Sequence, residues 1–182
     1  MNLSSLIQSI YPISNQSEEL LLTKFEEKEF PKRHLLLESD KVEQNLYFIK
    51  KGVVRAYFNS PDMDISFWFG VEGDPILSMQ SYISNKRSYE NIELIEDSIL
   101  YEIKISDLQH LYDTQIEIAN WGRKLAEKEL VKTEKLFLSR QFKSAADRYA
   151  ELLRENPAII QRVPLKIIAS YLGITQVSLS RI

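Results

Sequence analysis

The feature that most restricts the possible folds of this chain is a series of short apolar runs in its middle. Runs rich in aromatic and β-branched residues occupy positions 46–49, 53–58, 65–69, 92–95 and 99–103. Turn-forming residues separate them at positions 50–52, 59–62, 72–75 and 96–97. Short strands with a turn about every eight to twelve residues are typical of an antiparallel barrel or sandwich.

Helices are expected on both sides of these strands. Apolar residues recur at helical spacing within residues 3–10, and residues 15–18 offer an N-cap for a second helix. No proline lies between Pro75 and Pro157, and residues 117–142 are rich in Glu, Lys, Leu and Ala. This composition predicts one helix of about 39 Å. The expected fold class is therefore α+β.

One face of the long helix carries a stripe of small and apolar side chains, which favours contact with a second copy of the chain. A helix of this length exceeds one small domain, and small residues such as Gly122 allow two helices to approach closely. The alternative is a helix that packs only on its own sheet. The residues predicted to form the dimer interface are Ile118, Ala119, Gly122, Leu125, Ala126, Leu130, Thr133 and Phe137.

Composition excludes several classes of function. The chain has no Cys, which rules out disulfides, thiolate metal sites and a cysteine nucleophile. Its two His, His34 and His110, are far apart in the sequence, so we expect neither a metal site nor an enzyme. The first 23 residues lack Lys and Arg, and no apolar run approaches the ~18 residues of a membrane span. A cytoplasmic protein without membrane contact is expected.

Charge is distributed unevenly along the chain. Residues 140–182 hold seven basic and three acidic side chains, a net charge of +4, whereas residues 1–139 carry a net charge of −7. A basic C-terminal segment on an acidic body favours contact with an anion such as nucleic acid. Chance scatter of surface charge is the alternative.

The most specific pattern lies in residues 163–182 and fits a helix-turn-helix motif. Ala169 lies four residues before Gly173, so a small side chain stands where the two helices cross and a glycine supplies the positive φ of the turn. Thr175 is a natural N-cap for the second helix. The residues expected to be buried are Ile168, Leu172, Ile174 and Leu179.

The second helix of this motif would present polar side chains to DNA. In such motifs its N-terminal residues meet base edges in the major groove, where Gln pairs with adenine and Arg with guanine. The alternative is an ordinary helical hairpin with a glycine in its turn. The residues predicted to contact double-stranded DNA are Thr175, Gln176, Val177, Ser178 and Arg181.

Taken together, these segments resemble the cyclic-AMP receptor protein (Crp/Fnr) family of bacterial transcription regulators. Residues 30–32, 35–37 and 46–52 are similar to the opening strands of that family's cyclic-nucleotide-binding β-roll, and residues 72–74 to its Gly-Asp turn. Arg87-Ser88 is similar to the Arg-Ser pair of its phosphate-binding cassette. The resemblance covers residues 5–182 in the family's order.

The resemblance implies an architecture and a set of partners. It implies a sensory β-roll (a double-stranded β-helix) over residues 1–113, a dimerisation helix over 114–140 and a helix-turn-helix domain over 141–182. It further implies a homodimer on a near-palindromic operator, with RNA polymerase as a further candidate partner. The rival expectation is a sensory or scaffold module that has lost DNA binding.

The chain departs from the family pattern at three places. Nucleotide-binding members begin the cassette with Gly-Glu, whereas this chain has Leu77-Ser78. We therefore expect an effector other than cyclic AMP, such as another cyclic nucleotide or small anion, or none. Its predicted pocket comprises Ser78, Arg87 and Ser88, although Arg87 could equally be a solvated loop residue. Gln176-Val177 replaces the family's common Arg-Glu, and we expect the native chain to continue beyond Ile182.

Overall fold

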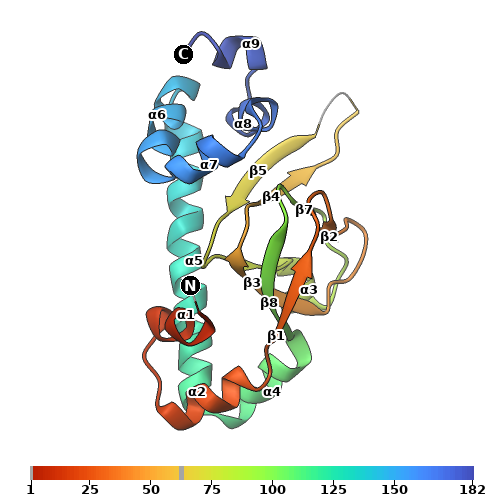
Figure 1. Ribbon diagram of the computed structural model, residues 1–182, viewed down its shortest axis with the longest axis vertical. Coiled ribbons are helices and arrows are strands. Elements are labelled where there is room, and N and C mark those ends of the chain that lie inside the picture. The colour runs from red at the N-terminus through yellow and green to blue at the C-terminus, as the bar shows by residue number, and fades with distance from the viewer. Residues whose placement is uncertain (1, 62–63) are drawn as a thin grey trace.

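The computed structural model describes residues 2–61 and 64–182 and shows two antiparallel sheets flanked by helices (Figure 1). One sheet has the strand order β1-β8-β3-β6 and the other β2-β7-β4-β5. The strands are β1 (Glu26–Phe30), β2 (Leu35–Leu37), β3 (Asn45–Lys51), β4 (Val54–Phe58), β5 (Ile65–Gly70), β6 (Pro75–Ile76), β7 (Asn91–Leu94) and β8 (Ser98–Lys104). We refer to residues 26–104 as the sheet region.

Helices precede, interrupt and follow the strands. They are α1 (Leu3–Ile10), α2 (Asn15–Leu22), α3 (Met79–Ser84), α4 (Ile105–Thr114), α5 (Ile116–Phe142), α6 (Ala145–Glu155), α7 (Pro157–Arg162), α8 (Leu165–Leu172) and α9 (Gln176–Leu179). In Figure 1, α5 runs along the long axis of the molecule, with α2 and α4 near one end and α6 to α9 at the other. No helix in the described part of the chain is long and apolar enough to cross a membrane. We refer to residues 145–182 as the C-terminal helices.

Strand β3 is buried on both of its faces, which explains its unbroken apolar sequence. Because side chains alternate along a strand, Leu46 and Phe48 point to one face and Tyr47 and Ile49 to the other. The first pair packs in a core with α1, α2, α4 and α5. The second pair packs in a core between the two sheets. The sheet region is thus joined to the helices through a shared apolar layer.

The first half of α5 packs in the core that β3 shares with α1, α2 and α4, which we call the helix-facing core. Ile118, Trp121 and Leu125 are buried there, and the Trp121 indole Nε1–H donates to the Ile7 carbonyl at 3.0 Å. A Cβ at Gly122 would lie 2.4 Å from the ring of Tyr112 in α4, so the small residue accommodates this chain's own tyrosine. The chain itself covers Ile118 and Leu125, which leaves them no surface for a second copy, whereas Gly122 is only partly buried and its contact with a second copy stays a prediction.

The second half of α5 is different. Ala126, Leu130, Thr133 and Phe137 are exposed, and Leu130 and Phe137 are 70% and 63% exposed, respectively. Ala119, the remaining member of the predicted stripe, is partly buried. The four exposed members lie at alternating spacings of four and three residues, which places them on one face. This face remains available for a partner.

The structure confirms the apolar strands and adds elements that the sequence pattern did not indicate. β3, β4, β5, β7 and β8 lie where the apolar runs predicted strands. β1 was missed because its sequence, EEKEF, is mostly charged; it pairs with β8 at the edge of its sheet. α2 is capped by Ser14, whose side chain accepts from Ser17 N, and not by residues 15–18. The predicted turn at 59–62 extends past the described residues.

Candidate nucleic-acid interface

The residues predicted to form a helix-turn-helix fold as two short helices joined by a tight turn. Helix α8 ends at Gly173, which adopts φ of 69°. The turn is closed by a hydrogen bond that the amide of Ile174 donates to the carbonyl of Ala169 at 3.1 Å. A Cβ at Gly173 would touch nothing within 4 Å, so glycine is favoured by the backbone conformation and not by a lack of space.

Helix α9 begins as its sequence predicts. The Thr175 hydroxyl accepts a hydrogen bond from the amide of Ser178 at 3.1 Å, which satisfies one of the free donors at the helix start. The Ser180 hydroxyl donates to the carbonyl of Gln176 at 3.0 Å. Thr175 is therefore engaged as the N-cap, as predicted.

The two helices rest on a buried apolar support. Ile168, Leu172 and Leu179 are buried, as predicted, and Ala169 is buried at the crossing point. Ile174 is partly buried against the same group. Leu152 of α6 and Ile159 of α7 belong to the same buried apolar cluster. This support fixes which side of α9 faces solvent.

The predicted DNA-contacting side chains lie on the solvent side of α9. Gln176, Val177 and Ser178 are exposed, together with Arg181. Arg181 lies beyond the end of α9 and not within it, contrary to the sequence prediction. Its amide donates a hydrogen bond to the carbonyl of Ser178 at 3.2 Å, so the backbone forms one more helical turn there. Figure 1 places α8 and α9 at one end of the molecule.

Most of the seven basic side chains in residues 140–182 make hydrogen bonds or ion pairs within the chain. Arg140 donates to the carbonyl of Phe67 at 2.8 Å, and Arg148 to that of Leu172 at 2.7 Å. Lys143 and Arg154 pair with acidic residues of α6. Arg162 pairs with Glu72 and Glu96 of the sheet region. Among the described residues, Lys166 and Arg181 alone of these seven bases make no such contact. The net charge of this segment therefore overstates the positive charge that is free to meet an anion.

The C-terminal helices also contact the sheet region directly. The Ser170 hydroxyl donates to the carbonyl of Asp64 at 2.6 Å and accepts from the amide of Ser66 at 3.0 Å. The rings of Phe69 and Tyr171 lie 4.9 Å apart. Helix α8 is therefore attached to β5 by polar and aromatic contacts, which sets the position of α9 relative to the sheet region.

The predicted effector residues differ in burial and in bonding partners. Ser78 is fully buried, and its hydroxyl has no partner among the described residues. Ser88 is buried, and its hydroxyl donates to the carbonyls of Glu38 and Glu90 at 2.9 and 3.3 Å. Arg87 is exposed. None of the three lines either of the two cavities that we describe in the molecule. Their role in effector binding stays a prediction.

Comparison with solved structures gives strong matches. FixK2 from Bradyrhizobium japonicum has a TM-score of 0.73 at 22% identity, over 86% of this chain and 81% of that one. A protein from Eubacterium rectale described as a transcriptional regulator of the Crp/Fnr family has a TM-score of 0.72 at 18% identity, over 95% and 85%. The c-di-GMP-responsive regulator CLP from Xanthomonas campestris has 0.69 at 18%, over 92% and 89%.

These matches extend across the sheets and the helices together. No family model and no curated protein matches the sequence. The likeness is therefore one of structure, and it covers most of both chains in each pair. The chain has the α+β, cyclic-nucleotide-binding-like fold of the Crp/Fnr transcription regulators.

Proposed function

We propose that this protein is a sequence-specific DNA-binding transcription regulator of the Crp/Fnr type. The observation that carries the proposal is the unit formed by α8, Gly173 and α9. Its inner face is buried on α6 and α7, and its outer face presents Gln176, Val177 and Ser178 at one end of the molecule. This is the arrangement in which a helix-turn-helix motif places its second helix in the major groove.

Each exposed side chain of α9 and the turn after it would contact a different group of the DNA. Gln176 can pair with adenine, Val177 can contact a thymine methyl group, and Arg181 can reach guanine or a phosphate. Residues 173–182 contain no acidic side chain that would repel DNA. The rival role, a scaffold without DNA binding, would not require an apolar support under a polar, acid-free face.

The protein would act as a homodimer through the second half of α5. Ala126, Leu130, Thr133 and Phe137 form an exposed face on that half, and a second copy would cover their apolar surface. Two copies joined there would present two α9 helices to successive turns of a near-palindromic site. RNA polymerase is the further partner that this role implies.

The sheet region would serve as a double-stranded β-helix with a sensory role that does not depend on cyclic AMP. Leu77, which stands at the Gly position of the family cassette, packs on the helix-facing core. The Ser88 hydroxyl is already bonded to two carbonyls. The cassette therefore lacks the carboxylate of the family's Gly-Glu pair and has its Ser88 hydroxyl already engaged, whereas Arg87 remains exposed.

The test is DNA affinity, measured by fluorescence anisotropy on a site selected from random sequence. Arg181→Ala should weaken binding to that site by about 1–3 kcal/mol. Lys24→Ala is the matched control, because Lys24 is an exposed base that follows α2 near the other end of α5. An equal loss on selected and random DNA would assign Arg181 to phosphate contact. No measurable DNA binding by the parent protein would overturn the proposal.

A further inference from the structure

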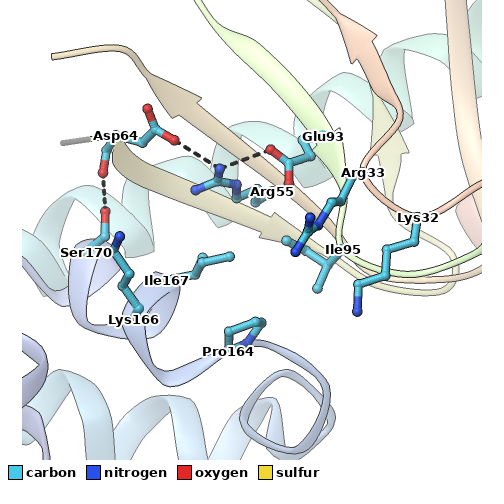
Figure 2. A pocket seen from close by; sticks show the side chains of 10 residues that line it. All are labelled: Lys32, Arg33, Arg55, Asp64, Glu93, Ile95, Pro164, Lys166, Ile167 and Ser170. Carbon is cyan, nitrogen blue, oxygen red and sulfur yellow. Dashed lines mark hydrogen bonds and ion pairs between the residues drawn. The ribbon is translucent and has the colours of Figure 1, made fainter.

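Helix α8 is packed incompletely against the rest of the chain. Figure 2 shows a cavity of 560 Å³ between the start of α8 and the sheet region. A second cavity, of 370 Å³, is lined by residues of β5, α5 and α6 and by Tyr171 near the end of α8. Because cavities interrupt the apolar packing of α8, its position depends on a few specific polar and aromatic contacts.

The last three residues of α8 are each held by a different contact. The Ser170 hydroxyl donates to the carbonyl of Asp64 at 2.6 Å (Figure 2). The ring of Tyr171 lies 4.9 Å from a ring of β5 and 5.2 Å from a guanidinium of α5. The carbonyl of Leu172 accepts a hydrogen bond from Arg148 of α6 at 2.7 Å. The end of α8 is thus attached to β5, α5 and α6 together.

The contact at Leu172 lies where the chain enters the turn. The last carbonyls of a helix have no partner within the helix, and a side chain can supply one. The Leu172 carbonyl belongs to the peptide bond that leads into Gly173, whose φ is 69°. A donor on this carbonyl therefore fixes the plane of that peptide bond. Only residues 173–175 separate it from α9, so its orientation influences where α9 begins.

Arg148 is firmly placed to hold this carbonyl. It lies on α6 one turn before Leu152, which is buried in the cluster that supports α8. The start of α6 is capped by the Ser144 hydroxyl, which accepts from the amide of Asp147 at 3.2 Å. A guanidinium at the C-terminal end of α8 also complements the partial negative charge of the helix carbonyls.

The surroundings of Arg148 are costly for stability, which indicates that the residue serves another purpose. Among the described residues, no acidic side chain pairs with Arg148, and its Nε is buried without a partner. The Nε of Arg140 is likewise buried and unpaired. Burial lowers the pKa of the Arg140 guanidinium, and the charge of Arg148 lowers it further. Buried cations without a counter-charge reduce stability. An apolar side chain would avoid this cost but would leave the Leu172 carbonyl without its donor.

We propose that Arg148 is a positioning residue, which fixes the turn at Gly173 through the Leu172 carbonyl and so sets the direction of α9. Its importance for DNA rests on the proposed function, whereas its effect on the turn does not. Base edges are read from one orientation of α9, whereas phosphate contacts tolerate several. Arg148 should therefore contribute more to the choice of DNA sequence than to DNA affinity in general.

The first test compares affinity for a selected DNA site with affinity for random DNA, measured by fluorescence anisotropy. Arg148→Met keeps an unbranched side chain without donors. It should weaken binding to the selected site by about tenfold or more, and binding to random DNA by less than about twofold. Arg148→Lys, which keeps a cationic donor, should recover most of this specificity. Arg154→Met is the matched control and should change neither affinity, because Arg154 is an exposed base of α6 that pairs with Glu155.

The second test is hydrogen–deuterium exchange of the whole chain without DNA, measured by mass spectrometry. In Arg148→Met, residues 165–179 should exchange about tenfold faster, whereas residues 98–104 of β8 should keep the parent rate. Unchanged exchange in residues 165–179 would overturn the proposal. So would an equal loss of affinity on selected and random DNA together with a lower melting temperature, because Arg148 would then be a purely structural residue. Absence of DNA binding by the parent protein would contradict the proposed function and leave the exchange result to decide the role of Arg148.

Discussion

The two halves of α5 have opposite surroundings, although both carry apolar side chains at helical spacing. In the first half, Ile118, Trp121 and Leu125 are enclosed by α1, α4 and the sheet region. In the second half, Leu130 and Phe137 are mostly exposed. The first half therefore attaches the helix to the rest of the chain, and the second half leaves apolar side chains exposed, which is where we propose the dimer contact.

This difference shows that one helical pattern can continue from a buried environment into an exposed one. A continuous apolar stripe indicates which side of a helix avoids water, but not whether the same chain or a partner covers it. Here the change occurs between Leu125 and Leu130, where α5 passes from the helix-facing core into solvent. Substitutions on either side of this point should have different effects.

The largest effect is expected from Trp121→Ala in the enclosed half. The substitution removes a fully buried ring and leaves the Ile7 carbonyl without the indole donor. We expect a loss of about 3–5 kcal/mol in the free energy of unfolding, measured by chemical denaturation. A loss below about 1 kcal/mol would show that this half of α5 does not hold the protomer together.

The next effect is expected from Phe137→Asp in the exposed half. A charge in the centre of a dimer interface should raise the dimer dissociation constant by about 100-fold or more, measured by sedimentation. The unfolding free energy of the isolated protomer should not change, because Phe137 is exposed. Ile83→Asp, at a residue of α3 that is 68% exposed, is the control and should leave the dimer intact. An unaffected Phe137→Asp dimer would place the interface elsewhere.

A smaller effect is expected from Gly122→Ala, which tests whether Gly122 lies in the enclosed half of α5. The new methyl group would press on the Tyr112 ring within the protomer. We expect a loss of about 1–2 kcal/mol in unfolding free energy, since overpacking exceeds the gain in helix propensity. Dimer affinity should not change. A weaker dimer with unchanged protomer stability would show that Gly122 faces the partner after all.

The smallest effect on stability is expected from the ion pair between Arg162 and Glu72, which joins the C-terminal helices to the sheet region. The Arg162 guanidinium lowers the pKa of the Glu72 carboxyl from 4.5 to about 2. The carboxylate therefore stabilises the fold above pH 4.5, and this contribution is lost as the pH falls through about 2. Because the pair is partly exposed, we expect about 1 kcal/mol. Glu72→Gln should lose this amount at pH 7, and the difference should vanish in acid. A difference independent of pH would contradict the assignment.

Local chemistry made much of the fold and part of the site predictable. The turn at Gly173, the cap at Thr175 and the burial of Leu172 and Leu179 follow from residue types at fixed spacing. The strands β3 and β8 follow from their apolar sequences. These elements depend on short-range patterns, which a single sequence contains.

The remaining features depend on contacts between distant residues. The pairing of Arg162 with Glu72 spans 90 positions in the sequence, so counting the basic residues of the C-terminal segment could not show that Arg162 is neutralised. The charged strand β1 forms because β8 provides its partner. The bond from Ser170 of α8 to the carbonyl of Asp64 likewise spans 106 positions. No local pattern indicates any of these arrangements.

The central claim is that a dimer of this chain reads a specific DNA sequence through α9. The most direct measurement is selection of genomic fragments by the purified whole chain without added ligand, followed by sequencing. The account predicts enrichment of a near-palindrome with half-sites about 34 Å apart, and loss of that enrichment in Phe137→Asp. A bound fraction with the same sequence composition as the input library would contradict it.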